Sequence, residues 1–179
     1  MQTKLKNVLF FAFGIFSISA LRAESLGPYE RSLASDADYS HAIQPALGFN
    51  RGQIVFNIDY EYRLSEHIGA GGNFYFTPEH ESTGYSKVVG VAAHAKLHAS
   101  LGEVDFYARP GLGFARVDYK VAGSSKDSVI LAPIFGIGAI YRVADNVGVG
   151  VEYLNTFNWT NDDVFESKHD FLIATQIRF

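Results

Sequence analysis

His94 and His98 are the first candidates for chemistry in this chain, because imidazole nitrogens are common metal ligands. The residues around them alternate between apolar and polar side chains, which predicts an extended strand. In a strand the two positions would be about 13 Å apart, whereas zinc binds its nitrogen ligands at about 2 Å. We therefore predict hydrogen-bonding roles for both histidines, and we expect no metal or other cofactor.

A serine, a histidine and an acid together would suggest ester hydrolysis. Ser82 with His80 and Glu79 is the nearest approach to such a set, and it is a poor one. We identify no histidine and serine two residues apart on an outward strand face near a rim, as chemistry on membrane lipid would require. Glu79–Glu81 is a candidate cation site, and Asp162–Asp163 is a candidate site for an external ligand or divalent ions. For both segments the alternative is an ordinary solvated loop.

Three glycine-rich stretches resemble phosphate-binding loops, namely Gly69–Gly72, Gly111–Gly113 and Gly148–Gly150. A phosphate-binding loop requires a following helix, and the sequence predicts none after any of them. We expect these glycines to relieve crowding inside a narrow barrel.

Charged residues recur at alternate positions of several segments, which places them on one common face. This face carries five acids and five bases, which are Asp59, Glu61, Asp105, Glu152 and Asp170 with Arg63, Lys96, Arg109, Arg142 and Arg178. From them, together with His94, we predict a packed interior ionic network, formed by Asp59, Glu61, His94, Lys96, Arg109, Arg142 and Glu152.

The elements that must position these residues are strands, because the hydrophobic period is two throughout. We predict eight, at Tyr39–Phe49, Ile54–Leu64, Ile68–Thr77, Ser86–His98, Val104–Phe114, Val129–Val143, Val147–Trp159 and Lys168–Phe179. The alternation breaks at Arg116 and Asp118, which suggests a bulge or an exit from the membrane, and a loop is expected at Ala122–Ser128. Pro110 and Pro133 each remove one ladder donor, so we expect them near a rim or a bulge.

The apolar face of each strand is about as long as a tilted strand needs to cross a bilayer. In a soluble sandwich the same face would form the core. A charge facing lipid near the midplane costs about 2–4 kcal/mol, so the segregation of charges fits a barrel whose outer face contacts lipid.

The composition agrees with this interpretation. Of 179 residues, 15% are aromatic, 17 are glycine and none is cysteine, which excludes a disulfide framework. The net charge of −4 argues against nucleic-acid binding. Residues 1–23 have the features of a cleavable signal peptide: Lys4 and Lys6, an apolar core and small residues before cleavage after Ala23 or Ala20. Residues 24–38 are expected to be a flexible segment, and residues 39–179 the barrel.

The stretches Tyr141–Tyr153 and Arg109–Phe114, with the signal peptide and the closing alternation, resemble the small outer-membrane β-barrel family typified by the transmembrane domain of OmpA and by OmpX. The resemblance implies an eight-stranded antiparallel up-and-down transmembrane β-barrel in the outer membrane of a diderm bacterium. It also implies that the alternating last strand is read by the assembly machinery, through Phe171, Ile173, Ile177 and Phe179. Because the sequence ends at Phe179, we expect no C-terminal peptidoglycan-binding domain.

Aromatic side chains at strand ends are typical of the interfacial girdles of such barrels. The candidates are Tyr60, Tyr62, Phe74, Phe76, Tyr141, Tyr153, Phe157 and Trp159. We predict a non-enzymatic barrel with a structural or surface-interaction role, whose expected partners are outer-membrane lipid, lipopolysaccharide, the assembly machinery and an extracellular ligand of the loops. A narrow porin-like channel and a lipid A-modifying enzyme are the alternatives.

Overall fold

The computed structural model describes residues 39–50, 53–78, 87–121, 124–159 and 167–179. The predicted signal peptide and the segment 24–38 lie outside the described residues, as do Glu79–Glu81, Ser82 and Asp162–Asp163. No helix in the described ranges is long and apolar enough to cross a membrane.

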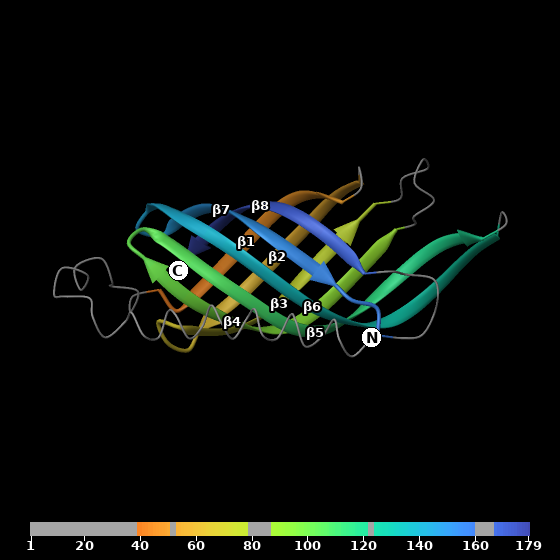
Figure 1. The fold of residues 1–179 in the computed structure, drawn as a ribbon, viewed down its shortest axis with the longest axis horizontal. Helices are drawn as coiled ribbons and strands as arrows, with labels where there is room; N and C mark the ends of the chain where they lie inside the picture. The colour runs from red at the N-terminus through yellow and green to blue at the C-terminus, as the bar shows by residue number, and fades with distance from the viewer. Residues whose placement is uncertain (1–38, 51–52, 79–86, 122–123, 160–166) are drawn as a thin grey trace, which may run out of the picture. The chain divides into compact units, whose positions relative to one another are not determined.

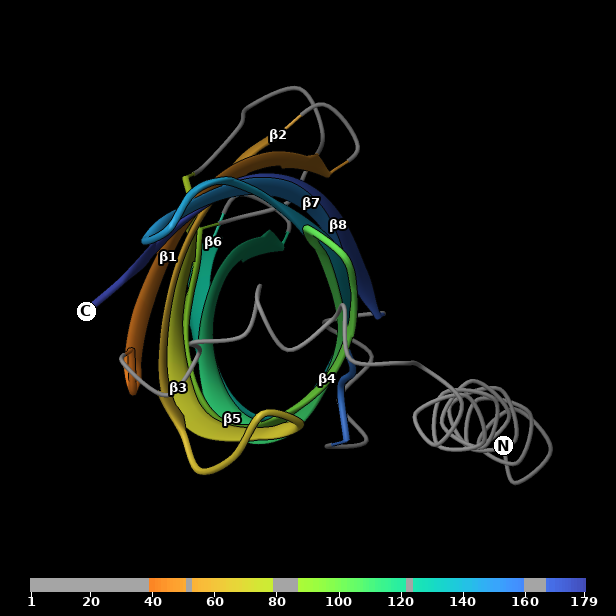
Figure 2. The same cartoon turned by 90° about the vertical axis from the view of Figure 1, so that its left-hand side faces the viewer.

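The described residues form one closed antiparallel barrel in which every strand pairs with its neighbours in sequence and β1 pairs with β8 (Figures 1 and 2). Its eight strands are β1 (His41–Asn50), β2 (Gln53–Arg63), β3 (Ile68–Thr77), β4 (Val88–Leu101), β5 (Val104–Val121), β6 (Ser124–Ala144), β7 (Val147–Thr156) and β8 (Lys168–Arg178). The predicted fold class is therefore confirmed.

Alternation of side chains decides which residues lie inside. In β2, every odd-numbered residue from Gln53 to Arg63 is buried and every even-numbered residue is exposed. The same period holds in β1 and β8. The outer surface is consequently apolar, and the interior receives most of the charged side chains.

The hairpin of β5 and β6 extends beyond the other strands (Figure 1). Its register is continuous from Val104 opposite Tyr141 to Val121 opposite Ser124, so Ser124–Ser128, predicted as loop, belong to β6 and the loop prediction is wrong there. Of the two explanations for the change at Arg116, the bulge is wrong for the same reason, whereas the exit from the membrane stays a prediction. Arg116 is an exposed outward residue that forms ion pairs in the extended hairpin, where two strands can pair with each other and still place charges in water.

Prolines occupy three barrel strands, and each coincides with a gap or an end in a ladder. Around Pro45 the β1–β8 register is interrupted between Ile43 and Ala46, and around Pro110 the β4–β5 register is interrupted between Ala108 and Gly111. Pro133 lies just beyond the last β6–β7 pair, at Ile134. Pro110 and Pro133 thus lie within strands, as predicted from the sequence, but Pro110 is not near a rim. At each proline, the missing backbone N–H falls where one of the two neighbouring strands forms no ladder pair.

Two inward tyrosines lie against inward glycines on the paired strand. Tyr75 is opposite Gly90, and Tyr107 is opposite Gly138. A Cβ atom built on either glycine would overlap the tyrosine ring. The absence of a side chain at these positions therefore makes room for large aromatic residues inside the barrel.

The interior also contains two apolar clusters, whose members have the inward phase of their strands. One is made of Ala46, Val55, Ala92, Tyr107, Ile134, Ile140, Leu154, Leu172 and Ala174. The other lies nearer the end with the longer connections and is made of Tyr75, Val88, Ala115, Val117, Ile130 and Ala132. Polar and apolar layers thus share the space inside the barrel.

Candidate functional site: the polar interior of the barrel

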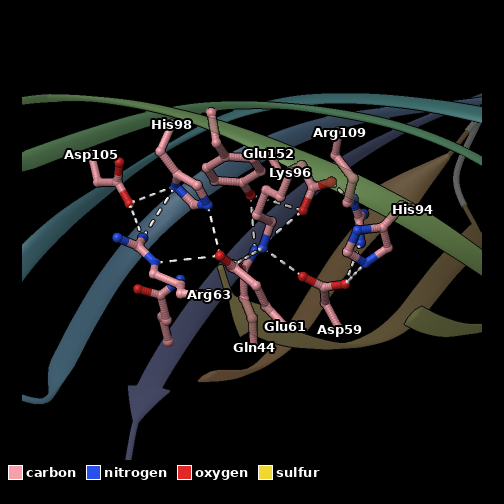
Figure 3. Close-up of polar contacts among 12 residues, drawn as sticks. Gln44, Asp59, Glu61, Arg63, His94, Lys96, His98, Asp105, Arg109 and Glu152 are labelled. Carbon is pink, nitrogen blue, oxygen red and sulfur yellow. Dashed lines mark hydrogen bonds and ion pairs between the residues drawn. The ribbon is translucent and has the colours of Figure 1, made fainter. Parts of the chain in front are cut away.

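Arg109 of β5 is completely buried at the centre of the polar interior. Its Nη1 donates a hydrogen bond of 2.9 Å to Oδ1 of Asp59 on β2, and its Nη2 donates to Glu152 on β7. Neither β2 nor β7 is a neighbour of β5 in the sheet, so both contacts cross the interior (Figure 3). The guanidinium therefore ties three separate parts of the barrel wall together.

Lys96 of β4 is the second fully buried cation. Its Nζ lies 2.6 Å from Oδ2 of Asp59, 3.2 Å from Oε2 of Glu61 and 3.3 Å from Oε1 of Gln44. The ammonium also lies 4.6 Å from the centre of the Tyr107 ring, within the range of a cation–π contact. Two carboxylates, one amide and one aromatic face thus surround a single positive charge.

Gln44 and Tyr107 connect Lys96 to Glu152. Nε2 of Gln44 donates to Oη of Tyr107 at 2.8 Å and to Oε2 of Glu152 at 3.2 Å. Tyr107 in turn donates to the same carboxylate oxygen at 2.9 Å. These contacts join β1, β5 and β7 across the interior.

His98 continues the network toward the short turns. Its Nε2 lies 2.7 Å from Oε1 of Glu61, and its Nδ1 lies 3.0 Å from Oδ2 of Asp105. Arg63 bridges the same two acids, with Nη2 at 2.6 Å from Asp105 and Nε at 3.3 Å from Glu61. His94 lies at the other end, with Nε2 at 2.5 Å from Oδ1 of Asp59.

The charges of this network balance within the described residues. Four acids, Asp59, Glu61, Asp105 and Glu152, face four permanent cations, Arg63, Lys96, Arg109 and Arg178. Burying one charge alone is very costly, but pairing and hydrogen bonding offset that cost. The network therefore occupies the interior without leaving a large net charge there.

A second polar cluster lies nearer the longer connections. Nζ of Lys168 donates to Oγ1 of Thr77 at 2.6 Å and lies 2.9 Å from Oδ2 of Asp170. Asn50 donates to the other oxygen of Asp170 at 2.9 Å. This cluster joins β1, β3 and β8.

Of the residues predicted to form the network, the structure brings together Asp59, Glu61, His94, Lys96, Arg109 and Glu152. Arg142 is half-buried in β6 close to the short turn before Val147. The prediction omitted six participants, which are Gln44, Arg63, His98, Asp105, Tyr107 and Arg178. All six have the inward phase of their strands, so polarity combined with phase was the signal that could have found them.

The predicted girdle residues lie on the outward face in two groups. Tyr60, Tyr62 and Tyr141 are near the short turns, whereas Phe74, Phe76, Tyr153, Phe157 and Trp159 are near the longer connections. The predicted assembly residues Phe171, Ile173, Ile177 and Phe179 are all exposed on the outward face of the last strand. Phe179 exchanges backbone hydrogen bonds of 3.0 and 2.9 Å with His41, where the last strand meets the first.

The expectation that no serine and histidine share an outward face two residues apart is wrong. Ser167 directly precedes β8 and His169 is exposed on its outward face, while Lys168 between them is buried. Nδ1 of His169 lies 2.5 Å from Oη of Tyr153. The histidine is thus oriented by a phenol, where a serine–histidine–acid set uses a carboxylate.

The described residues contain no group of three or more His, Cys, Asp and Glu side chains that could hold a metal ion. His94 and His98 contact different carboxylates, Asp59 for the first and Glu61 with Asp105 for the second. Within the described strands, the chemistry of the interior is therefore one of ion pairs and hydrogen bonds between side chains.

Comparison with known proteins gives a consistent result. The sequence model of a family described as "Outer membrane protein beta-barrel domain" matches residues 8–179. No curated protein matches the chain. Among solved structures, the N-terminal β-barrel domain of Pseudomonas aeruginosa OprF is similar with a TM-score of 0.63 and 11% identity, covering 78% of this chain and 96% of that one.

Two further structures are similar at comparable coverage. Neisserial surface protein A (NspA) has a TM-score of 0.59 and 16% identity over 78% of this chain and 94% of that one. The outer membrane enzyme PagL has a TM-score of 0.54 and 11% identity over 77% of this chain and 99% of that one. At these identities the similarity concerns the fold.

Proposed function

This chain belongs to the family of outer membrane proteins with a β-barrel domain, and from that premise we propose that it is a non-enzymatic barrel with a structural or surface-interaction role, closed by its own side chains. Its location is the outer membrane of a diderm bacterium. The apolar outward residues face the lipid, and the interior is separated from it by the barrel wall.

The observation that carries the proposal is the position of Arg109. It is completely buried between Asp59 and Glu152, which come from strands on different sides of the interior. An eight-stranded barrel is just wide enough for side chains to fill. A paired guanidinium across this space leaves no continuous path for hydrated ions at that level.

Conductance in a planar lipid bilayer tests the proposal. We expect the purified, refolded chain to insert without producing steady channels, while a general porin measured in the same bilayer does produce them. Large and steady channels from this chain would overturn the proposal and favour a narrow solute pore.

The partners that we propose follow from the outer surface. The two groups of outward aromatic residues suit the two interfaces of the outer membrane, with lipopolysaccharide on the side of the longer connections. Short turns face the periplasm in this class of barrel, so the extended β5–β6 hairpin projects outward, where it can meet an extracellular ligand.

A lipid-modifying enzyme is the second candidate, and the pair formed by Ser167 and His169 favours it. Both residues have the outward phase at the outer rim, where the head groups of lipid would lie. Mass spectrometry of lipid A from cells that express the chain tests this candidate. A mass change that is present with the natural chain, absent with His169→Ala and kept with His67→Ala, an exposed histidine at the opposite end, would establish the enzyme.

A further inference from the structure

The seam between β1 and β8 differs from every other strand pair of the barrel, because no turn or loop connects its two strands. All other neighbouring strands are consecutive in the chain, so a connection ties each of those pairs together. The seam is held only by its own ladder and by the side chains that cross it.

Pro45 divides the ladder of the seam into two segments. His41 exchanges two backbone hydrogen bonds with Phe179, so the odd-numbered residues of β1 are the ones that bond to β8. Pro45 has the same parity and has no N–H to donate. The ladder is accordingly interrupted between Ile43 and Ala46.

The two segments of the seam are unequal. Residues 46–49 of β1 form four ladder pairs with β8, and next to them Asn50 donates to Asp170 across the seam at 2.9 Å. The short-turn segment, formed by residues 41–43 of β1 and 177–179 of β8, has two ladder pairs and the backbone exchange of His41. Fewer backbone bonds therefore hold the short-turn segment.

A cluster of aromatic rings lies on the outer face of the short-turn segment, with His41 at its centre. The imidazole stacks on Phe179 at 5.7 Å between centroids and lies 5.1 Å from the ring of Tyr62. Its Nδ1 lies 2.7 Å from Oη of Tyr60. Both tyrosines belong to β2, so this cluster, which we call the clasp, joins β2, β1 and β8.

Each strand of the short-turn segment is also held on its other side. The backbone N–H of Arg63 donates to the carbonyl of Ser40, and that of Arg178 donates to the carbonyl of Asn146, both at 2.8 Å. If the segment parts, β1 stays on β2 and β8 stays on β7. The interruption around Pro110 differs, because five ladder pairs and a short turn follow it on the same side.

We infer that the short-turn segment of the seam opens as a unit while the rest of the barrel stays folded, and that His41 controls this opening through the clasp. The free energy of a local opening is set by the hydrogen bonds and contacts that break in it. Here these are the few backbone bonds of the segment and the ring contacts of His41. The opening gives the interior lateral access to the membrane interface at the end of the short turns.

Hydrogen exchange of backbone amides, measured by NMR on the ¹⁵N-labelled barrel in lipid nanodiscs, tests the inference on the natural chain. The amide of Ile43 faces β8, whereas those of Ala42 and Gln44 face β2 at the same height of the barrel. We expect Ile43 to exchange about tenfold faster than these two neighbours and than Leu47, which faces β8 beyond the interruption. Equal rates for all four amides would overturn the inference.

Variants of His41 test the clasp. His41→Ala should accelerate exchange at Ile43 by a further factor of about three to ten and leave Leu47 unchanged. His41→Phe keeps a stacking ring and should restore most of the protection. The control is His169→Ala, which removes an outward histidine whose Nδ1 lies 2.5 Å from a tyrosine hydroxyl of β7, away from the short-turn segment, and it should leave Ile43 unchanged. Equal acceleration at Ile43 and Leu47 in His41→Ala, or the same acceleration in His169→Ala, would contradict a local opening controlled by His41.

Discussion

Arg109 and Asp59 meet across the interior of the barrel at 2.9 Å, although their strands are separated by two others in the sheet. The contact closes the space between opposite parts of the wall. Asp59 also contacts Lys96 and His94, and Arg109 also contacts Glu152. The pair formed by Arg109 and Asp59 therefore links most of the network.

Replacing Arg109 by alanine should lower the free energy of unfolding by about 3–5 kcal/mol, because it leaves a buried acid without its partner. The matched control is Arg116→Ala, since the Arg116 side chain is 61% exposed whereas that of Arg109 is 0% exposed. The control should change stability by less than about 0.5 kcal/mol. Urea titration of both variants in lipid vesicles measures the difference, and equal midpoints would show that water replaces the lost partner.

The pair formed by Arg109 and Glu152 should be strongly coupled. Removing either side chain leaves the other charged and buried, whereas Arg109→Met with Glu152→Gln removes both charges together. We expect the double variant to be more stable than the sum of the single effects predicts, by about 1–3 kcal/mol. A double-mutant cycle from urea midpoints gives this energy, and additive effects would contradict the direct contact.

Gly138→Ala should destabilise the barrel by about 1–3 kcal/mol through overpacking. The new Cβ would overlap the ring of Tyr107, which also donates to Glu152 and cannot move without breaking that bond. Gly72→Ala is the control, because a Cβ there meets one backbone oxygen, that of Ala92, at 3.2 Å. Comparison of the unfolding midpoints checks the prediction, which fails if Gly72→Ala costs as much.

Phe179→Ala should reduce the amount of folded barrel in the outer membrane. Phe179 pairs with His41 where β1 and β8 close the sheet, and its ring stacks on that histidine at 5.7 Å between centroids. The control is Phe114→Ala, an exposed outward phenylalanine away from this seam. The heat-dependent shift of the folded band on a gel, from outer-membrane fractions, measures the yield. Equal yields for both variants would argue against a special role of the terminal residue.

Much of the fold could be predicted because the decisive signal is local. Side chains alternate with period two, so the parity of Asp59, Glu61 and Lys96 placed them on one face without knowledge of their partners. The outward phase of Ile58 and Tyr60 followed from the same rule. The membrane interpretation followed from the length of the apolar faces and from the absence of charges on them.

The partners of these residues could not be predicted, because they depend on closure of the whole sheet. Gln44 and Glu152 are 108 residues apart and meet only when β1 and β7 stand on the same cylinder. The length of the β5–β6 hairpin was also missed, since strand pairing continues past outward charged residues such as Arg116.

The sequence by itself determined the number and order of the strands, their inner and outer faces and the balanced charges of the interior, because each of these depends on the residue type and its parity. The tertiary structure alone decided which charges meet and how Tyr107 fits over Gly138. Those properties depend on the stagger between strands, which sets the height of each inward side chain inside the closed barrel.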